Sequence, residues 1–146
     1  MRSLHLIVLC LAAFAVPASA AVKTEVVEYK QGDTVLQGLL SYDDAAKGKR
    51  PAVLVVHDWM GVSDYTRMRC EMLARLGYVA LAADVYGKGV RPTNAQEASA
   101  EAGKYYKDPA LLRARVRAGR DFLASRPQAD ATRLAAMGYC FGGKCA

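Results

Sequence analysis

Three short, almost wholly apolar runs constrain the fold of this chain most strongly. They read "AVLVVH" (52–57), "YVALAAD" (78–84) and "RLAAMGY" (133–139). Apolar runs of this length are typical of strands that are covered on both faces. Stretches with helical periodicity separate them, and alternating strands and helices favour a mostly parallel sheet with helices on both faces. We therefore expect a single α/β domain.

Two further β-prone runs precede this alternation. They are "TEVVEY" (24–29) and "TVLQGLLSY" (34–42), and the turn-forming residues Lys30-Gln31-Gly32-Asp33 separate them. Two strands joined by such a short polar turn predict an antiparallel hairpin. We therefore expect an N-terminal hairpin followed by the parallel part of the sheet.

Helical periodicity appears in three segments, about 64–76, 95–107 and 108–125. The first has a capping residue at Ser63 or Asp64 and a stop at Gly77, and the third has Pro109 at its first position. The pattern predicts that the apolar residues of each helix face the sheet. For the first helix these are Tyr65, Met68, Met72, Leu73 and Leu76, and for the third they are Leu112, Val116, Gly119 and Leu123.

The formal net charge is +6, and its densest group lies on the third helix, at Arg113, Arg115, Arg117 and Arg120. These arginines lie opposite an apolar face, so we interpret them as a solvated helix face and expect no nucleic-acid partner. The sequence has neither a CxxC pair nor a His/Cys spacing suited to zinc, so no metal or other cofactor is expected.

The first twenty residues have the pattern of a secretory signal. Arg2 precedes an apolar run from Leu4 to Val16, and Pro17 and Ala18-Ser19-Ala20 follow. We expect cleavage after Ala20, which leaves residues 21–146 as an exported domain in the periplasm or outside the cell. An uncleaved membrane anchor is the alternative, although the run is short for a span. After cleavage we expect no stable membrane span.

A glycine-boxed cysteine follows the last apolar run. Gly138-Tyr139-Cys140-Phe141-Gly142 fits the G-x-nucleophile-x-G pattern at a strand-to-helix turn. Such a turn lifts the nucleophile above the sheet in a strained conformation, and the glycines allow neighbouring chain to come close. We interpret Cys140 as a catalytic nucleophile, the alternative being a buried structural cysteine in a glycine-rich turn.

A second loop, "HDWMG" (57–61), follows the run at 52–57. An acyl-transfer site needs two N–H donors for the developing oxyanion, and in α/β-hydrolases they come from the residue after the nucleophile and from the loop after the third strand. The backbone amides of Phe141 and Trp59 occupy these positions. His57 precedes the nucleophile, whereas this fold orders its triad as nucleophile, acid and histidine, so we expect His57 to orient its own loop.

Taken together, "PAVLVVHDWMGVSDYTR", "LGYVALAADVYGKG" and "MGYCFGGK" resemble the dienelactone hydrolase family of the α/β-hydrolase fold. The resemblance implies a cysteine nucleophile that hydrolyses small lactones or esters with a Cys-His-Asp triad and no metal. Asp58 matches an acidic position beside the thiol, where the family usually has glutamate; a loop carboxylate that caps local N–H groups is the alternative. Tyr86 and Lys88 match substrate-binding positions, and a solvated lysine is the alternative for Lys88.

The family order places the acid and the histidine after Cys140, so we expect them beyond residue 146 and interpret the chain as part of a longer hydrolase that is nearly inactive alone. A non-catalytic member that binds a small molecule or partner remains the alternative. A thiol redox protein ranks last because a CxxC is lacking. Cys145 is expected in the core rather than as a resolving thiol, and Cys70 has no assigned role.

Overall fold

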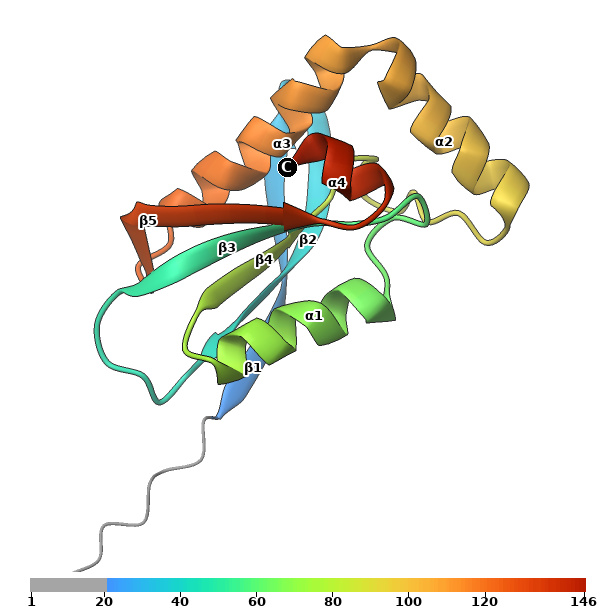
Figure 1. Cartoon of the computed structure of the whole chain (residues 1–146). Helices are drawn as coiled ribbons and strands as arrows, with labels where there is room; N and C mark the ends of the chain where they lie inside the picture. Colours follow the sequence, from blue (N-terminus) through green and yellow to red (C-terminus); the bar gives the residue numbers. More distant parts are fainter. Residues whose placement is uncertain (1–20) are drawn as a thin grey trace, which may run out of the picture.

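The computed structural model describes residues 21–146, and the predicted signal segment, residues 1–20, lies outside the described residues. Figure 1 shows one sheet with helices on both faces. The strands are β1 (Val22–Gln31), β2 (Thr34–Asp43), β3 (Arg50–Val56), β4 (Val79–Ala83) and β5 (Ala129–Gly138). The helices are α1 (Asp64–Arg75), α2 (Ala95–Lys107), α3 (Pro109–Ala124) and α4 (Phe141–Cys145).

The sheet has the strand order β1-β2-β4-β3-β5. β1 and β2 form the predicted antiparallel hairpin, and β2 continues antiparallel onto β4. β3 lies parallel between β4 and β5, with Leu54 opposite both Leu81 and Ala136. This is the predicted α/β class with its N-terminal hairpin. Because β3, β4 and β5 are parallel, the loops after all three strands emerge at one edge of the sheet.

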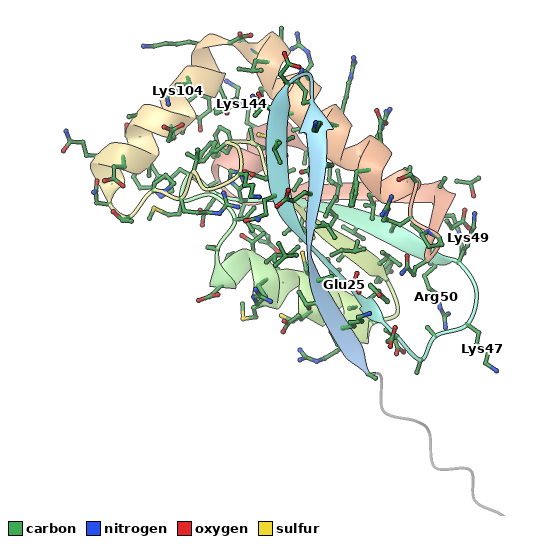
Figure 2. The ribbon with its side chains drawn as sticks, turned by 180° about the vertical axis from the view of Figure 1, so that it is seen from behind. Glu25, Lys47, Lys49, Arg50, Lys104 and Lys144 are labelled. Carbon is green, nitrogen blue, oxygen red and sulfur yellow. The ribbon has the colours of Figure 1, made fainter. Side chains whose placement is uncertain are left out.

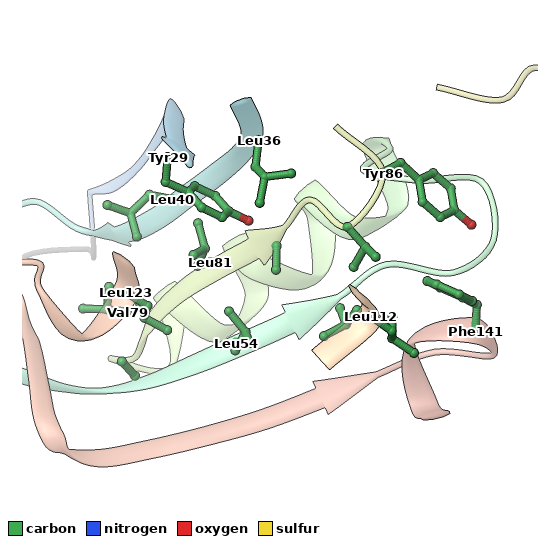
Figure 3. Packing of buried hydrophobic residues seen from close by; sticks show 14 of the residues in the cluster. Tyr29, Leu36, Leu40, Leu54, Val79, Leu81, Tyr86, Leu112, Leu123 and Phe141 are labelled. Carbon is green, nitrogen blue, oxygen red and sulfur yellow. The ribbon is translucent and has the colours of Figure 1, made fainter. Parts of the chain in front are cut away.

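The core is divided between the two faces of the sheet. The larger cluster lies on the α2/α3 face and includes Leu36, Leu54, Leu81, Leu123 and Phe141 (Figure 3). The smaller cluster lies between α1 and the sheet and consists of Leu39, Val53, Val55, Cys70, Ala80 and Ala82. The strand runs predicted as doubly covered are therefore buried on both faces where β3 and β4 cross the centre of the sheet.

Two helices begin with the caps that their sequences encode. The Asn94 side chain accepts a hydrogen bond from the Glu97 amide at the start of α2, and Asp108 accepts one from Leu111 at the start of α3. Pro109 occupies the first turn of α3, as predicted. α1 ends before Gly77, which has a positive φ of 87°.

The predicted inner face of α1 is wrong. Its buried residues are Thr66, Cys70 and Ala74, whereas four of the five apolar residues expected inside are exposed: Tyr65, Met68, Met72 and Leu76. Leu73 alone of that set packs against the core, and it is partly buried. Small side chains let the helix lie close to the sheet, and the larger apolar residues then fall on its outer side. Periodicity identified the helix but not the face that it buries.

The arginines predicted as a solvated face of α3 need one correction. Arg113, Arg117 and Arg120 are exposed, but Arg115 is buried beside Leu112 and Gly119. Its Nη2 donates a hydrogen bond of 3.0 Å to the Thr34 hydroxyl, which ties α3 to the turn of the hairpin. Other basic residues are spread over the molecule, with Lys47, Lys49 and Arg50 at one end and Lys104 and Lys144 at the other (Figure 2).

Candidate active site

The turn from β5 into α4 centres on Cys140, which is exposed. Its backbone has φ 52° and ψ −110°, and Cys140 is the only non-glycine residue among residues 21–146 with a positive φ. A non-glycine residue in such a conformation costs about 1–3 kcal/mol and persists only where surrounding contacts enforce it. The sharp turn at Cys140 therefore lowers the free energy of unfolding of the chain.

Two glycines make this turn possible. A Cβ added to Gly142 would lie 2.5 Å from the His57 carbonyl oxygen and closer still to that of Val56. A Cβ added to Gly138 would lie 2.8 Å from the Gly143 nitrogen and would overlap the Gly142 carbonyl. Only glycine fits at either position. The close approach at Gly142 also seats the turn against the end of β3, where the loop 57–61 begins.

The residues on either side of Cys140 are anchored on opposite faces of the sheet. Tyr139 meets α1, because its hydroxyl accepts a 2.6 Å hydrogen bond from Arg69 Nε and its ring packs edge-on against Tyr65. Phe141 is fully buried on the other face, stacked on the His57 ring at 5.8 Å and 5.5 Å from the Tyr86 ring. Figure 3 shows Phe141 and Tyr86 together at this end of the core. Phe141 also packs edge-on against Tyr105 and Tyr106 of α2, so contacts from both helical layers fix the turn.

His57 links two loops through its ring. Nδ1 donates to the Asp58 carbonyl at 2.5 Å, and Nε2 accepts a 3.2 Å hydrogen bond from the Val85 amide after β4. Burial lowers the pKa of this imidazole, which favours the neutral ring that such a donor-and-acceptor pair requires. Both nitrogens are occupied, which confirms the expectation that His57 orients its loop.

The loop after His57 is held by its own side chains and by Tyr86. Asp58 Oδ1 accepts a 2.7 Å hydrogen bond from the Met60 amide, so this carboxylate caps a local turn. The Tyr86 hydroxyl donates to the Trp59 carbonyl at 3.0 Å, and burial raises the pKa of this phenol. Trp59 itself is 39% exposed. These bonds fix the peptide between Trp59 and Met60. The preceding peptide, which carries the Trp59 amide, is held by the bond from His57 Nδ1 to the Asp58 carbonyl.

The predicted site residues do not all meet. Contacts connect the Cys140 turn, Phe141, His57, Tyr86 and the Trp59 loop. Lys88 lies apart from these contacts, because its ammonium pairs with Glu28 of β1 at 2.7 Å on the surface. Cys145 is partly buried, and its thiol donates to the Phe141 carbonyl at 3.2 Å. Burial raises the pKa of Cys145 to about 11 and that of the buried Cys70 to about 12.

The buried carboxylate of Asp84 has a role that the sequence analysis missed. It accepts hydrogen bonds from the amides of Gln37, Tyr86 and Gly87, and Arg91 lies 3.6 Å away. It therefore shapes the loop that delivers Tyr86 to Trp59. The only signal in the sequence is a single acidic residue that ends an apolar strand run. Among residues 21–146 no group of His, Cys, Asp and Glu side chains is arranged to hold a metal.

A sequence model of the dienelactone hydrolase family matches residues 36–146, which are most of the chain. The chain belongs to the dienelactone hydrolase family. The match includes β2 from Leu36 onward, β3 to β5, the loop at 57–61 and the Cys140 turn. It confirms the resemblance read from the three sequence segments.

Individual relatives agree with the family. The chain is 34% identical over 103 residues to a protein of Methylorubrum extorquens named "Putative carboxymethylenebutenolidase", covering 68% of this chain and 35% of that protein. Two solved structures, titled "m3DLH" and as a dienelactone hydrolase-like promiscuous phosphotriesterase P91 from metagenomic libraries, are 40% and 36% identical. Their TM-scores are 0.83 and 0.82, and in both cases 86% of this chain covers 52% of the other. The chain thus spans about half, or less, of the length of these family members.

Proposed function

We propose that this chain supplies the nucleophile and the oxyanion-binding amides of a hydrolase that acts on small esters or lactones. The backbone of Cys140 carries this proposal, because an exposed thiol on a positive-φ turn between a strand and a helix is the arrangement of a nucleophile elbow. Family membership supports the same reaction class. The ester and lactone substrates follow from the sequence resemblance.

Two amides are proposed as oxyanion donors, one from Phe141 and one from Trp59. Within residues 21–146 neither amide is a donor in a hydrogen bond outside regular helices and strands, whereas the next amides, of Gly142 and Met60, are bonded internally. Unused donors on two loops that pack together are suited to an anion that develops between them. The bond from His57 Nδ1 to the Asp58 carbonyl supports this arrangement, because it holds the peptide that carries the Trp59 amide.

The proposed chemistry is acyl transfer through sulfur. The Cys140 thiolate adds to the substrate carbonyl, and the two amides stabilise the oxygen that gains the charge. Collapse of this intermediate breaks the carbon–oxygen bond of the ester, and the leaving alkoxide takes a proton from a general acid. Water then attacks the thioester and releases the carboxylic acid and the thiol. In a lactone the leaving alkoxide stays attached to the acid product.

The base for these proton transfers is proposed to lie outside residues 21–146. His57 is the one histidine of the described residues, and both of its nitrogens hold backbone groups. Asp58 is proposed to influence the thiol from its turn, and Tyr86 to position the Trp59 peptide as well as to border the substrate. Lys88 is proposed to meet an anionic substrate only after its pairing with Glu28 is broken.

Export is a second part of the proposal. The charged, apolar and small-residue pattern of residues 1–20 favours cleavage after Ala20 and a periplasmic or extracellular protein. No helix among residues 21–146 has the length and apolar character to cross a bilayer. Mass spectrometry of the protein recovered after secretion tests the cleavage, because an N-terminus at Ala21 is expected. Recovery of the uncleaved chain in the membrane fraction would contradict it.

The nucleophile is tested by selective alkylation of the full chain at pH 8. Iodoacetamide followed by peptide mass spectrometry is expected to label the exposed Cys140 first. Cys145 and Cys70 should react far more slowly, because burial raises their pKa values to about 11 and 12 and leaves only about one thiol in 10³–10⁴ ionised. An activated ester such as p-nitrophenyl acetate should then release about one equivalent of nitrophenol in a burst.

The matched control is Cys145→Ser, which should keep the burst, while Cys140→Ser should remove it. Since general-base help is worth about 10²–10⁴ in rate, turnover after the burst should be slow without an added base. Burst release that survives in Cys140→Ser would exclude Cys140 as the nucleophile. Slow labelling of Cys140 together with no acylation would favour a non-catalytic binding protein.

A further inference from the structure

A cavity of about 470 Å³ lies where α1 meets the hairpin, apart from the Cys140 turn. Its walls come from four segments, with Val26 on β1, Leu39 on β2, Met60 and Arg67 around the start of α1, and Arg91 after β4. This volume is in the range of small-molecule sites, about 300–1,000 Å³, and the walls combine apolar side chains with a few charged ones.

Arg67 is the charged group of this cavity that is free to meet a ligand. Among residues 21–146 no carboxylate lies within ion-pair distance of its guanidinium. Glu71, one turn further along α1, is a natural partner, but its carboxylate accepts a hydrogen bond from the Thr24 hydroxyl at 3.3 Å. The Arg67 side chain is partly buried, so a carboxylate that reached it would be shielded from some of the solvent.

The other charged residues of the cavity are balanced or exposed. Arg91 donates to the carbonyls of Val90 and Gln37 at 2.7 and 3.0 Å and lies 3.6 Å from the buried Asp84. Asp64 also lines the cavity from the first turn of α1, where it is exposed and adds one negative charge. Arg67 is therefore the one cation of the cavity without a carboxylate partner among residues 21–146, and a single such cation near the Asp64 carboxylate suits a monoanion better than a polyanion.

Apolar side chains form the rest of the lining. Val26, Leu39, Met60 and Val62 surround the space between Arg67 and the hairpin. We propose that this cavity binds a small amphipathic carboxylate, whose anionic group pairs with Arg67 and whose hydrocarbon part lies against Val26, Leu39 and Met60. The site is distinct from the proposed active site, because neither Cys140 nor Trp59 lines it.

Met60 gives the cavity a link to the active-site loop. Its amide donates to Asp58 Oδ1 at 2.7 Å, and Trp59 lies between the two residues. A ligand that packs on the Met60 side chain therefore restricts the turn that orients the Trp59 amide. This link, unlike the binding itself, rests on the proposed function: a carboxylic acid released by ester hydrolysis belongs to the ligand class of the cavity and would feed back on the loop.

Trp59 is the only tryptophan of the chain, which provides a direct readout. Octanoate, kept below its micelle concentration, is titrated into the full chain while tryptophan emission is followed. A saturable change is expected. Arg67→Met should weaken the apparent affinity about tenfold, as expected for the loss of one charge-assisted pair at a partly exposed site. Octanamide, which has the same length but no charge, should bind as weakly to the wild type.

The matched control is Arg75→Met, which removes an exposed arginine of the same helix outside the cavity and should leave the affinity unchanged. Equal octanoate affinities of Arg67→Met and the wild type would overturn the proposal. If circular dichroism shows that Arg67→Met is unfolded, the pair Val26→Asp and Val26→Lys decides, since Val26 is 61% exposed at the rim. The aspartate should weaken octanoate binding relative to the lysine, and equal affinities would overturn the proposal.

The binding test is independent of catalysis. Cys140→Ser should bind octanoate as the wild type does, because Cys140 lies outside the cavity. Failure of octanoate to bind while Cys140 still forms an acyl-enzyme would remove this inference alone. Binding without acylation would leave the cavity in place and remove the proposed function.

Discussion

At the scale of single residues, the Cys140 turn depends on two glycines that have no side chain. Gly138 and Gly142 have no Cβ at two points where backbone meets backbone, and Cys140 takes the positive φ between them. Gly143, one position further, has ordinary space around it, because a Cβ there would lie 3.7 Å from the Gly138 oxygen. The adjacent residues Gly142 and Gly143 thus differ sharply, because only Gly143 has room for a Cβ.

This difference predicts the effect of two alanine substitutions. Gly142→Ala should lower the free energy of unfolding by about 3 kcal/mol, because the new methyl group overlaps the carbonyls of Val56 and His57. Gly143→Ala should be neutral or stabilising by up to about 1 kcal/mol, since α4 loses a flexible residue without a clash. Urea unfolding of both variants measures the difference. Equal stabilities of the two variants would mean that Gly142 does not lie in close contact with the carbonyls at the end of β3.

Cys70 predicts a pH dependence. Its pKa in the folded protein is raised from 9.0 to about 12 by burial between α1 and the sheet. A raised pKa favours the protonated thiol, so its contribution to stability is complete below pH 9 and is lost as the pH rises toward 12. The free energy of unfolding should therefore fall more steeply over this window in the wild type than in Cys70→Ala. Parallel curves for the two proteins would contradict a buried, protonated thiol.

At the scale of elements, α1 shows which features a sequence pattern can predict and which it cannot. The strands, the hairpin and the helices could be predicted, because apolar runs, turn residues and caps are local signals. The buried face of α1 could not, since it depends on how closely the helix approaches the sheet, and Thr66, Cys70 and Ala74 permit that approach. Arg115 was misread for a similar reason, because its partner Thr34 lies 81 residues away. The glycine-boxed turn was identifiable, whereas the Asp84 network was not.

The exposed side of α1 predicts a pair of opposite outcomes. Met72→Lys should change the free energy of unfolding by less than about 0.5 kcal/mol, because this side chain faces solvent. Ala74→Leu adds volume between helix and sheet and should destabilise by about 1–3 kcal/mol. Thermal unfolding followed by circular dichroism compares them. Strong destabilisation by Met72→Lys would contradict this assignment and indicate that α1 buries the face predicted from periodicity.

At the scale of the whole molecule, both ends of the sheet are edge strands. Among residues 21–146, β1 pairs only with β2 and β5 pairs only with β3. Most of β5 from Ala131 to Ala136 is exposed. An exposed strand edge with apolar side chains is a template for pairing with another chain. Within the described residues, the strand that leads to the nucleophile is therefore an open edge.

This edge predicts self-association of the 146-residue chain. Ala135→Lys places a charge on the open strand and should lower concentration-dependent light scattering, because charged edges resist pairing. Ala100→Lys makes the same change on the exposed surface of α2 and serves as the control. Equal scattering by the two variants would show that β5 is not the contact.

The anchoring of the residues on either side of Cys140 has a consequence for motion. Tyr139 is held by α1, and Phe141 packs against Tyr105 and Tyr106 of α2, so each helical layer holds the chain one residue away from Cys140. If the layers slide against each other, the backbone of Cys140 is the place where the displacement accumulates. The height of the thiol above the strands would then report the alignment of the layers, and a distant mutation that shifts either layer would change its reactivity without touching it.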